Sequence, residues 1–149
     1  MSLFKKFTSL FRVGTARPQP QSDAGDSELV RVDIVGEASY QRELGILAGP
    51  KTEDGVSVWK PAELVPEPNN PYDPQAVVAR IEGYTVGYLS RAKARAFHRM
   101  MAEFYPAGEP LTEVKAEIRG GWLRAGGDEG YFGVALYVQE RIARRLEDE

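Results

Sequence analysis

The chain has 149 residues, a hydrophobic fraction of 42%, no cysteine, one histidine and a formal net charge of −3. This length and composition fit one domain with tails, and the missing cysteines exclude disulfide scaffolds, cysteine-based zinc sites and thiol nucleophiles. The single histidine excludes metal sites built from two or three histidines, and the mean charge argues against nucleic acid as a partner.

The mean charge conceals two basic segments. Residues 1–19 contain four basic and no acidic residues, and residues 90–102 also contain four basic and no acidic residues. Residues 20–89 hold twelve acidic and five basic residues, which accounts for the negative total. Nucleic acid therefore stays open as a partner, through a local contact of modest affinity.

The first 28 residues are predicted to form a basic amphipathic segment followed by a flexible linker. Five large apolar residues recur there at spacings of three and four, as on one face of a short helix. Residues 13–28 are rich in Pro, Gly, Ser, Gln and Asp, which is typical of a linker. A loosely ordered terminus is the alternative. The apolar residues are Leu3, Phe4, Phe7, Leu10 and Phe11.

No segment reaches the roughly 20 consecutive apolar residues that a membrane-spanning helix needs, and the N-terminus lacks the apolar region of a secretory signal. We therefore expect a cytoplasmic protein without a membrane span. The folded domain is expected over residues 29–140, with a polar C-terminal tail over residues 141–149. The polar end of the chain, residues 139–149, is interpreted as a short frayed helix.

Alternating apolar and polar residues predict several short strands in the folded domain. Residues 76–81 and 85–89 are joined by a tight turn and should form a hairpin. Residues 37–46 are polar and should form one helical turn, and a glycine-rich loop carries Trp122 either as a lid on the core or as an exposed stacking surface. The predicted strands cover residues 29–34, 56–67, 76–81, 85–89, 113–119 and 131–138.

The main helix is expected to begin after Ser90, a good N-cap residue, and to end near Phe104, before Pro106 and Gly108. Its apolar residues fall on one face, which should pack on the core, while its basic residues mostly face away. The predicted core face consists of Ala94, Phe97, Met101 and Phe104.

These elements predict a mainly β, α+β fold. Five or six short strands with one principal helix suggest a small and strongly curved antiparallel sheet. A closed or partly closed barrel would protect the edge strands of such a sheet best.

Motifs of common enzyme classes are missing from the sequence. It contains no P-loop, no dinucleotide-binding GxGxxG, no HExxH and no GxSxG. No side chain is set up as an activated nucleophile or general base, so we expect a protein that is not an enzyme and needs no cofactor. His98 is interpreted as an imidazole at the surface or at the edge of the core, with a phosphate contact as the alternative.

Three sequence blocks, in order, resemble the HIRAN domain family. They are VGEASYQ at residues 35–41, PEPNNPYDPQAV at residues 66–77 and VGYLSR at residues 86–91. The resemblance extends over residues 29–138 and is closest to the stand-alone form found in bacteria and phages. It implies a small OB/SH3-like antiparallel β-barrel of about six strands with one main helix. It also implies binding of single-stranded DNA near a free 3′ end, as in the HIRAN modules of Swi/Snf-type helicases.

The resemblance assigns roles to particular residues of this chain. Tyr72 would stack on the terminal nucleotide, Asp73 would accept a hydrogen bond from the 3′-hydroxyl, and Asn70 would shape the turn. Tyr88 and Arg91 would face the backbone or a base.

The chain departs from the helicase domains at one place. Ala38 and Ser39 stand where those domains carry an arginine and an aromatic residue, and Tyr40 follows. One stacking face and one phosphate contact are therefore missing, which weakens the expectation of strict 3′-end specificity.

The residue chemistry fits a single-strand binder without the resemblance. Such proteins combine aromatic stacking faces with a basic groove along the backbone. Asp73 suits a hydroxyl end better than a phosphate run, because a carboxylate beside a nucleic acid needs a donor. The candidate faces are Tyr40, Tyr72 and Tyr88, and the candidate basic residues are Arg91, Lys93, Arg95 and Arg99.

Structural roles remain open for several of these residues. Asp73 can cap its own turn, Tyr72 can fill the mouth of the barrel, and the basic face of the helix can simply be solvated. Gly87 is expected to permit close strand packing and to contact no ligand.

The predicted function is a non-enzymatic nucleic-acid-binding module, for single-stranded DNA near a 3′-hydroxyl end, in DNA repair or replication. A helicase or another repair protein is the expected protein partner. The alternative is a protein-interaction adaptor that docks through the barrel and the N-terminal amphipathic segment. A metal-dependent nuclease using Asp73 is a third interpretation.

Overall fold

The structure is a computed structural model, and it describes residues 28–105 and 109–147. Our predictions of an amphipathic segment and a linker before residue 28 lie outside the described residues. In the described part no helix is both long and apolar enough to cross a bilayer.

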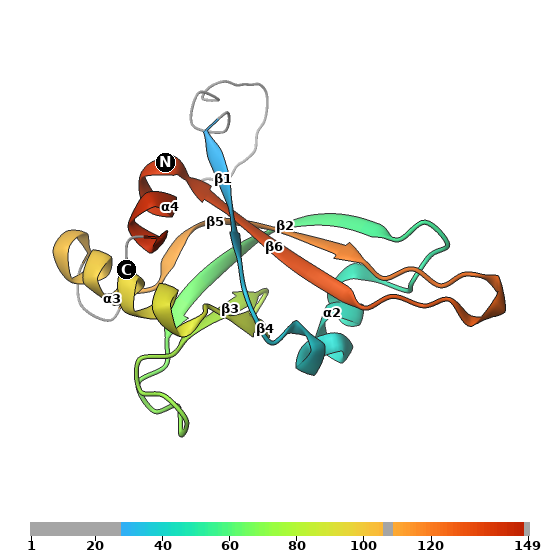
Figure 1. Cartoon of the computed structure of the whole chain (residues 1–149), viewed down its shortest axis with the longest axis horizontal. Coiled ribbons are helices and arrows are strands. Elements are labelled where there is room, and N and C mark those ends of the chain that lie inside the picture. Colours follow the sequence, from blue (N-terminus) through green and yellow to red (C-terminus); the bar gives the residue numbers. More distant parts are fainter. Residues whose placement is uncertain (1–27, 106–108, 148–149) are drawn as a thin grey trace.

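Six antiparallel strands form one sheet, in the order β1-β6-β5-β2-β3-β4. Each predicted strand is present, with ends shifted by up to two residues, because the alternation of apolar and polar side chains matches the pleat of a half-buried sheet. Figure 1 shows the long strands β2, β5 and β6 crossing the molecule side by side. The strands are β1 (Leu29–Asp33), β2 (Val56–Pro66), β3 (Val77–Ile81), β4 (Tyr84–Tyr88), β5 (Leu111–Gly120) and β6 (Phe132–Gln139).

The curved sheet is not closed into a barrel. Val35, two residues beyond the end of outer strand β1, forms an isolated bridge with Tyr88, the last residue of the other outer strand β4. The Val35 amide donates to the Tyr88 carbonyl at 2.8 Å, and the Tyr88 amide donates to the Val35 carbonyl at 2.9 Å. The predicted antiparallel sheet of about six strands is thus confirmed, but it is open instead of closed into a barrel.

The main helix α3 (Arg91–Phe104) begins as predicted, because the Ser90 side chain accepts a hydrogen bond from the Lys93 amide at 3.2 Å. Ala94, Phe97 and Met101 face the core, but Phe104 does not. Phe104 is 59% exposed, and the Arg145 guanidinium lies 4.6 Å from the centroid of its ring. The last turn of α3 thus places Phe104 at the surface beside the C-terminal helix.

Residues 37–46 hold more helix than the single turn we predicted. A short 3-10 helix, η2 (Glu37–Tyr40), leads directly into α2 (Gln41–Ala48). Leu44 and Leu47 of α2 are buried, and the Gln41 side chain is bonded to both the amide and the carbonyl of Phe132 at 2.8 and 2.9 Å. These contacts with β6 stabilise α2. The polar composition of residues 37–46 gave no sign of a helix of this length.

The short helix expected at the C-terminal end is present as α4 (Glu140–Glu147), but it is packed on the domain instead of frayed. Its Ile142, Ala143 and Leu146 lie on one face and are buried, so the charged residues between them cover only the outer face. A further 3-10 turn, η3 (Ala125–Gly127), lies in the glycine-rich loop between β5 and β6.

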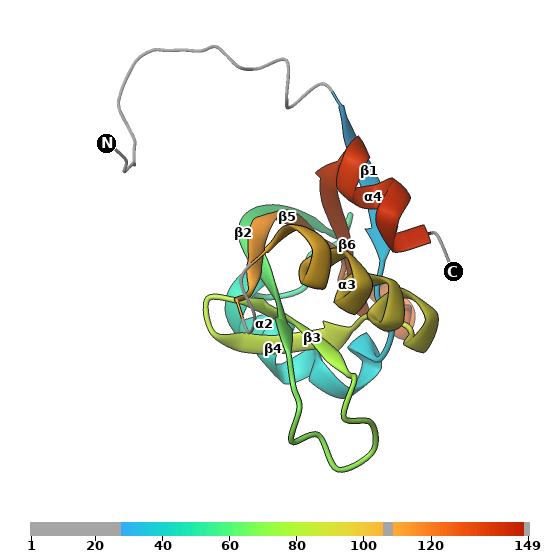
Figure 2. The same cartoon turned by 90° about the vertical axis from the view of Figure 1, so that its left-hand side faces the viewer.

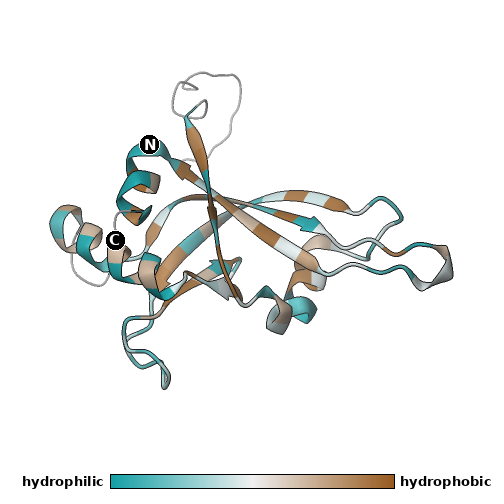
Figure 3. Ribbon diagram, in the orientation of Figure 1, coloured by the Kyte–Doolittle hydropathy of each residue, from teal (hydrophilic) through white to brown (hydrophobic). Residues whose placement is uncertain are grey.

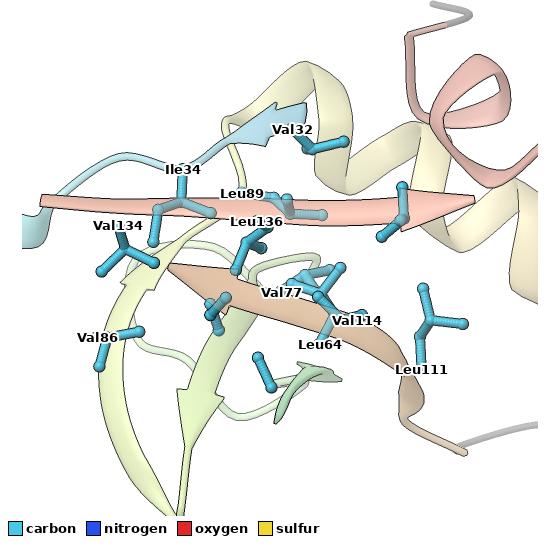
Figure 4. Close-up of a cluster of buried hydrophobic side chains, with 14 of the residues drawn as sticks. Val32, Ile34, Leu64, Val77, Val86, Leu89, Leu111, Val114, Val134 and Leu136 are labelled. Atoms are coloured by element: carbon cyan, nitrogen blue, oxygen red, sulfur yellow. The ribbon is translucent and has the colours of Figure 1, made fainter. Parts of the chain in front are cut away.

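The core consists of residues from all six strands and from the inner faces of α2, α3 and α4. Figure 2 shows α3 lying across the curved sheet. Val32 of β1, Leu64 of β2 and Leu136 of β6 belong to the core, together with Leu89, which directly follows β4 (Figure 4). Hydrophobic and hydrophilic residues alternate along the strands, whereas the loop between β2 and β3 is hydrophilic and projects from the domain (Figure 3). That loop contains the segment on which our functional prediction rests.

Candidate nucleic-acid interface

A surface pocket of about 740 Å³ lies between the β2–β3 loop, the end of η2, the end of β4 and the start of α3. Six of the seven residues predicted for the site line it, and Arg95 does not. Segments that are far apart in the sequence are thus brought to one concave surface. The lining residues are Tyr40, Glu67, Pro68, Asn69, Asn70, Pro71, Tyr72, Asp73, Ala76, Tyr88, Leu89, Arg91 and Ala94.

Asn70 organises the loop. Its amide donates to the Glu67 carbonyl at 3.0 Å, which closes the first turn. Its side-chain oxygen Oδ1 then accepts from the amides of Tyr72 at 2.9 Å and Asp73 at 3.1 Å. Asparagine is suited to this position because its short side chain can bond to backbone groups two and three residues ahead.

Asp73 takes part both in the turn and in the pocket. Its Oδ1 accepts from the Gln75 amide at 2.9 Å, so the turn-capping role that we left open is present. Its Oδ2 lies 3.9 Å from Nε of Arg91, across the mouth of the pocket. One carboxylate oxygen therefore shapes the loop while the other faces the helix.

Tyr72 is the most exposed large hydrophobic residue in the described part of the chain, at 88%. The alternative that it fills the mouth of the barrel is wrong. Pro71 and the Asn70 bonds fix the backbone around Tyr72 while the ring has little contact with the protein. An aromatic ring in this situation offers a face for stacking.

Tyr88 and Tyr40 form the opposite wall, with ring centroids 6.4 Å apart and planes tilted by 45°. The Tyr88 hydroxyl donates to Oε1 of Glu67 at 2.9 Å. The pKa of Tyr88 is raised above its ordinary value, mainly by burial and to a smaller extent by this hydrogen bond. The phenol therefore stays neutral and remains a donor.

Glu67 is a lining residue that the sequence reasoning missed. Besides the Tyr88 hydroxyl, its Oε1 accepts from Nδ2 of Asn70 at 3.0 Å, and its Oε2 lies 3.8 Å from the Arg80 guanidinium. The spacing of three residues between Glu67 and Asn70 in a proline-rich turn was the available signal.

Of the four candidate basic residues of α3, Arg91 is the one that lines the pocket. Its side chain is 72% exposed. Arg95 is also exposed but lies outside the pocket lining. His98 is turned toward the loop, with Nε2 3.0 Å from the Gln75 carbonyl oxygen, so it links α3 to the β2–β3 loop.

Trp122 is neither a lid on the core nor a free stacking surface. Its indole nitrogen donates to Oδ1 of Asp128 at 3.1 Å, and the Arg124 guanidinium lies 5.2 Å from the ring centroid. Gly130 packs so closely that a side chain there would collide with the indole. The ring is thus held within its own loop.

Among the described residues, no group of three or more His, Asp or Glu side chains could hold a metal ion.

Part of the chain matches a known protein family. Residues 47–107 match the family model of the HIRAN domain, which confirms the resemblance over β2, β3, β4, α3 and the pocket loop. No curated protein matches the chain.

Two similar solved structures are HIRAN domains. The crystal structure of the HIRAN domain of human HLTF is 17% identical, with a TM-score of 0.34 over 80% of this chain and 84% of that chain. The NMR structure of the HLTF HIRAN domain in its DNA-bound conformation is 18% identical, with a TM-score of 0.36 over 81% and 84%.

Proposed function

We propose that this chain is a non-enzymatic DNA-binding module whose pocket receives single-stranded DNA near a 3′-hydroxyl end. The observation that carries the proposal is the convergence of Tyr40, Tyr72, Tyr88 and Arg91 around one pocket, with the Tyr72 ring turned to solvent. The HIRAN family match supports it, because the matched residues 47–107 contain most of the pocket lining.

The geometry suggests how the strand would be held. A base can stack on the open face of Tyr72, which contributes about 1–3 kcal/mol per base in such proteins. The exposed Arg91 guanidinium can donate two hydrogen bonds to a phosphate next to that base. Tyr88 stays neutral and adds an aromatic wall instead of a negative charge.

The two carboxylates in the pocket favour the end of a strand. Glu67 and Asp73 both line it, and a phosphate placed between them would be repelled. A terminal hydroxyl is a donor, and Oδ2 of Asp73 faces the mouth of the pocket, where it can accept. This distribution of charge suits the end of a strand that places its terminal hydroxyl at Asp73 and the neighbouring phosphate at Arg91.

Fluorescence anisotropy with labelled oligonucleotides of one sequence tests the proposal. We expect the 3′-hydroxyl strand to bind more tightly than the 3′-phosphorylated strand, and a blocked 5′ end to have no effect. Equal affinity for the two 3′ ends would contradict end recognition. Binding that is absent, or that does not weaken with salt, would contradict a nucleic-acid ligand altogether.

We further propose that the protein acts in DNA repair or replication, where free 3′ ends occur, with strand remodelling supplied by a partner such as a helicase. The adaptor alternative depends partly on the N-terminal amphipathic segment, which lies outside the described residues, and it stays a prediction. Cytoplasmic localisation also stays a prediction.

A further inference from the structure

The Glu67 carboxylate connects two walls of the pocket that are remote in sequence. One of its oxygens, Oε1, accepts from the Tyr88 hydroxyl at 2.9 Å and from Nδ2 of Asn70 at 3.0 Å. Tyr88 ends strand β4, whereas Asn70 lies in the β2–β3 loop. A single acceptor atom therefore ties the loop to the sheet.

The connection continues from Asn70 to the residues proposed to touch DNA. Nδ2 of Asn70 is held by Glu67, so its Oδ1 points the other way, toward the amides of Tyr72 and Asp73. The orientation of the Asn70 amide group is thus fixed by a donor bond on one side and two acceptor bonds on the other.

Glu67 is itself held in place. Its side chain is only 24% exposed, and Arg80 of β3 lies 3.8 Å from its second oxygen, Oε2. The phenol of Tyr88 stays protonated because its pKa is raised by burial and by the bond to Glu67, so the donor persists over the ordinary pH range. Charge-assisted bonds of this kind are stronger than neutral ones.

We propose that Glu67 is the positioning residue of the pocket: by joining Tyr88 to Asn70 it holds the loop so that Tyr72 and Asp73 face the incoming strand. Glu67 itself makes no contact with DNA. This inference rests on the proposed function. It assigns to a carboxylate, which would otherwise repel a nucleic acid, the task of ordering the site before the ligand arrives.

Two substitutions separate positioning from direct contact. In Glu67→Gln the side-chain carbonyl can accept both hydrogen bonds, whereas the negative charge is lost. In Glu67→Ala both bonds are lost. Glu129→Ala is the matched control, because it removes one exposed carboxylate that pairs with Lys51 at 2.8 Å outside the pocket.

Amide hydrogen exchange, measured by NMR in the absence of DNA, reports directly how firmly the β2–β3 loop is held. We expect Glu67→Ala to speed exchange at the Tyr72 and Asp73 amides about tenfold, and Glu67→Gln and Glu129→Ala to leave it nearly unchanged. Unchanged exchange in Glu67→Ala would overturn the proposal. Should Glu67→Ala lower the melting temperature strongly, Tyr88→Phe removes only one of the two donors and is expected to give a smaller increase at the same amides.

Binding of a 3′-hydroxyl single strand, followed by anisotropy, completes the test. We expect Glu67→Ala to weaken binding about tenfold, while Glu67→Gln stays within about twofold of the wild type. An equal loss in Glu67→Gln and Glu67→Ala would show that tight binding does not depend on the two hydrogen bonds that Glu67→Gln keeps, which overturns a positioning role. If the wild type binds no strand, the proposed function fails, and exchange at the two loop amides still decides whether Glu67 orders the loop.

Discussion

Arg91 and Asp73 face each other across the mouth of the pocket, with Nε of the guanidinium 3.9 Å from Oδ2 of the carboxylate. This separation is too long for a strong hydrogen bond, so both groups retain capacity for another partner. The Arg91 side chain is 72% exposed and that of Asp73 26%. A cation for a phosphate and an acceptor for a hydroxyl thus stand side by side.

Replacement of Arg91 by alanine should weaken binding of single strands by a similar factor whatever their sequence. A phosphate contact carries no base information, and its loss should reduce the slope of log K against log salt by about 0.7. Salt-dependent anisotropy on several oligonucleotides measures both quantities. Arg31→Ala, which removes an exposed arginine outside the pocket lining, is the control. A loss confined to one sequence would contradict the phosphate role.

Asp73 requires two substitutions because its two oxygens have different partners. Asp73→Asn keeps an acceptor for the Gln75 amide, so the melting temperature should hardly change while the preference for a 3′-hydroxyl falls. Asp73→Ala also loses the turn, which should cost about 0.5–1.5 kcal/mol of unfolding free energy. If Asp73→Asn binds both 3′ ends as the wild type does, Asp73 acts in the turn alone.

Tyr72→Ala should weaken DNA binding strongly and leave stability nearly unchanged. Tyr72 is 88% exposed, so removal of its ring exposes little of the core, whereas a lost stacking contact costs about 1–3 kcal/mol. Tyr72→Phe should retain most of the affinity. Tyr131→Ala serves as the control, since Tyr131 is 69% exposed and does not line the pocket. Similar affinities for the two alanine variants would exclude stacking on Tyr72.

The strands were predictable because each leaves a local signal. Alternation along residues 29–34 gave a strand, and Ser90 marked the start of α3. The open sheet was not predictable, because closure depends on how far the two outer strands run beside each other. Here they are joined by the bridge between Val35 and Tyr88.

Errors in the prediction concentrate where contacts between distant segments decide the outcome. Leu146 is buried although charged residues surround it in sequence, because α4 folds back onto α3 and β1. Phe104 has the spacing of a core residue but lies on the last turn of α3, beside Arg145. Arg95 shares a helix with Arg91 but lies outside the pocket lining, and its contact with nucleic acid stays a prediction.

The Tyr88 phenol predicts a loss of stability in alkali. Its pKa is raised in the folded protein by burial and by the bond to Glu67, so the unfolded chain releases the proton first as the pH rises above about 10. The contribution is fully present below that pH and declines above it. Urea unfolding from pH 9 to pH 11 should therefore show a steeper decline for the wild type than for Tyr88→Phe. Parallel curves would show that Tyr88 titrates normally.

Gly87 tests whether the bridge between the outer strands supports the pocket. A Cβ at this position would lie 2.7 Å from Cδ1 of Ile34 and 2.9 Å from the Val35 carbonyl oxygen. The Ile34 side chain can shift, but the Val35 carbonyl belongs to the backbone and accepts the Tyr88 amide at 2.9 Å. Gly87→Ala must therefore move the segment that holds Tyr88.

We expect Gly87→Ala to lower the unfolding free energy by about 1–3 kcal/mol, as overpacking usually does, and to weaken DNA binding through displacement of Tyr88. Gly133→Ala is the matched control, because it lies in β6 with no atom within 4 Å of an added Cβ and should be nearly neutral. Urea unfolding and anisotropy on both variants make the comparison. Lost binding with unchanged stability in Gly87→Ala would instead place Gly87 against the ligand, because a strand that packs without strain leaves Tyr88 where it was.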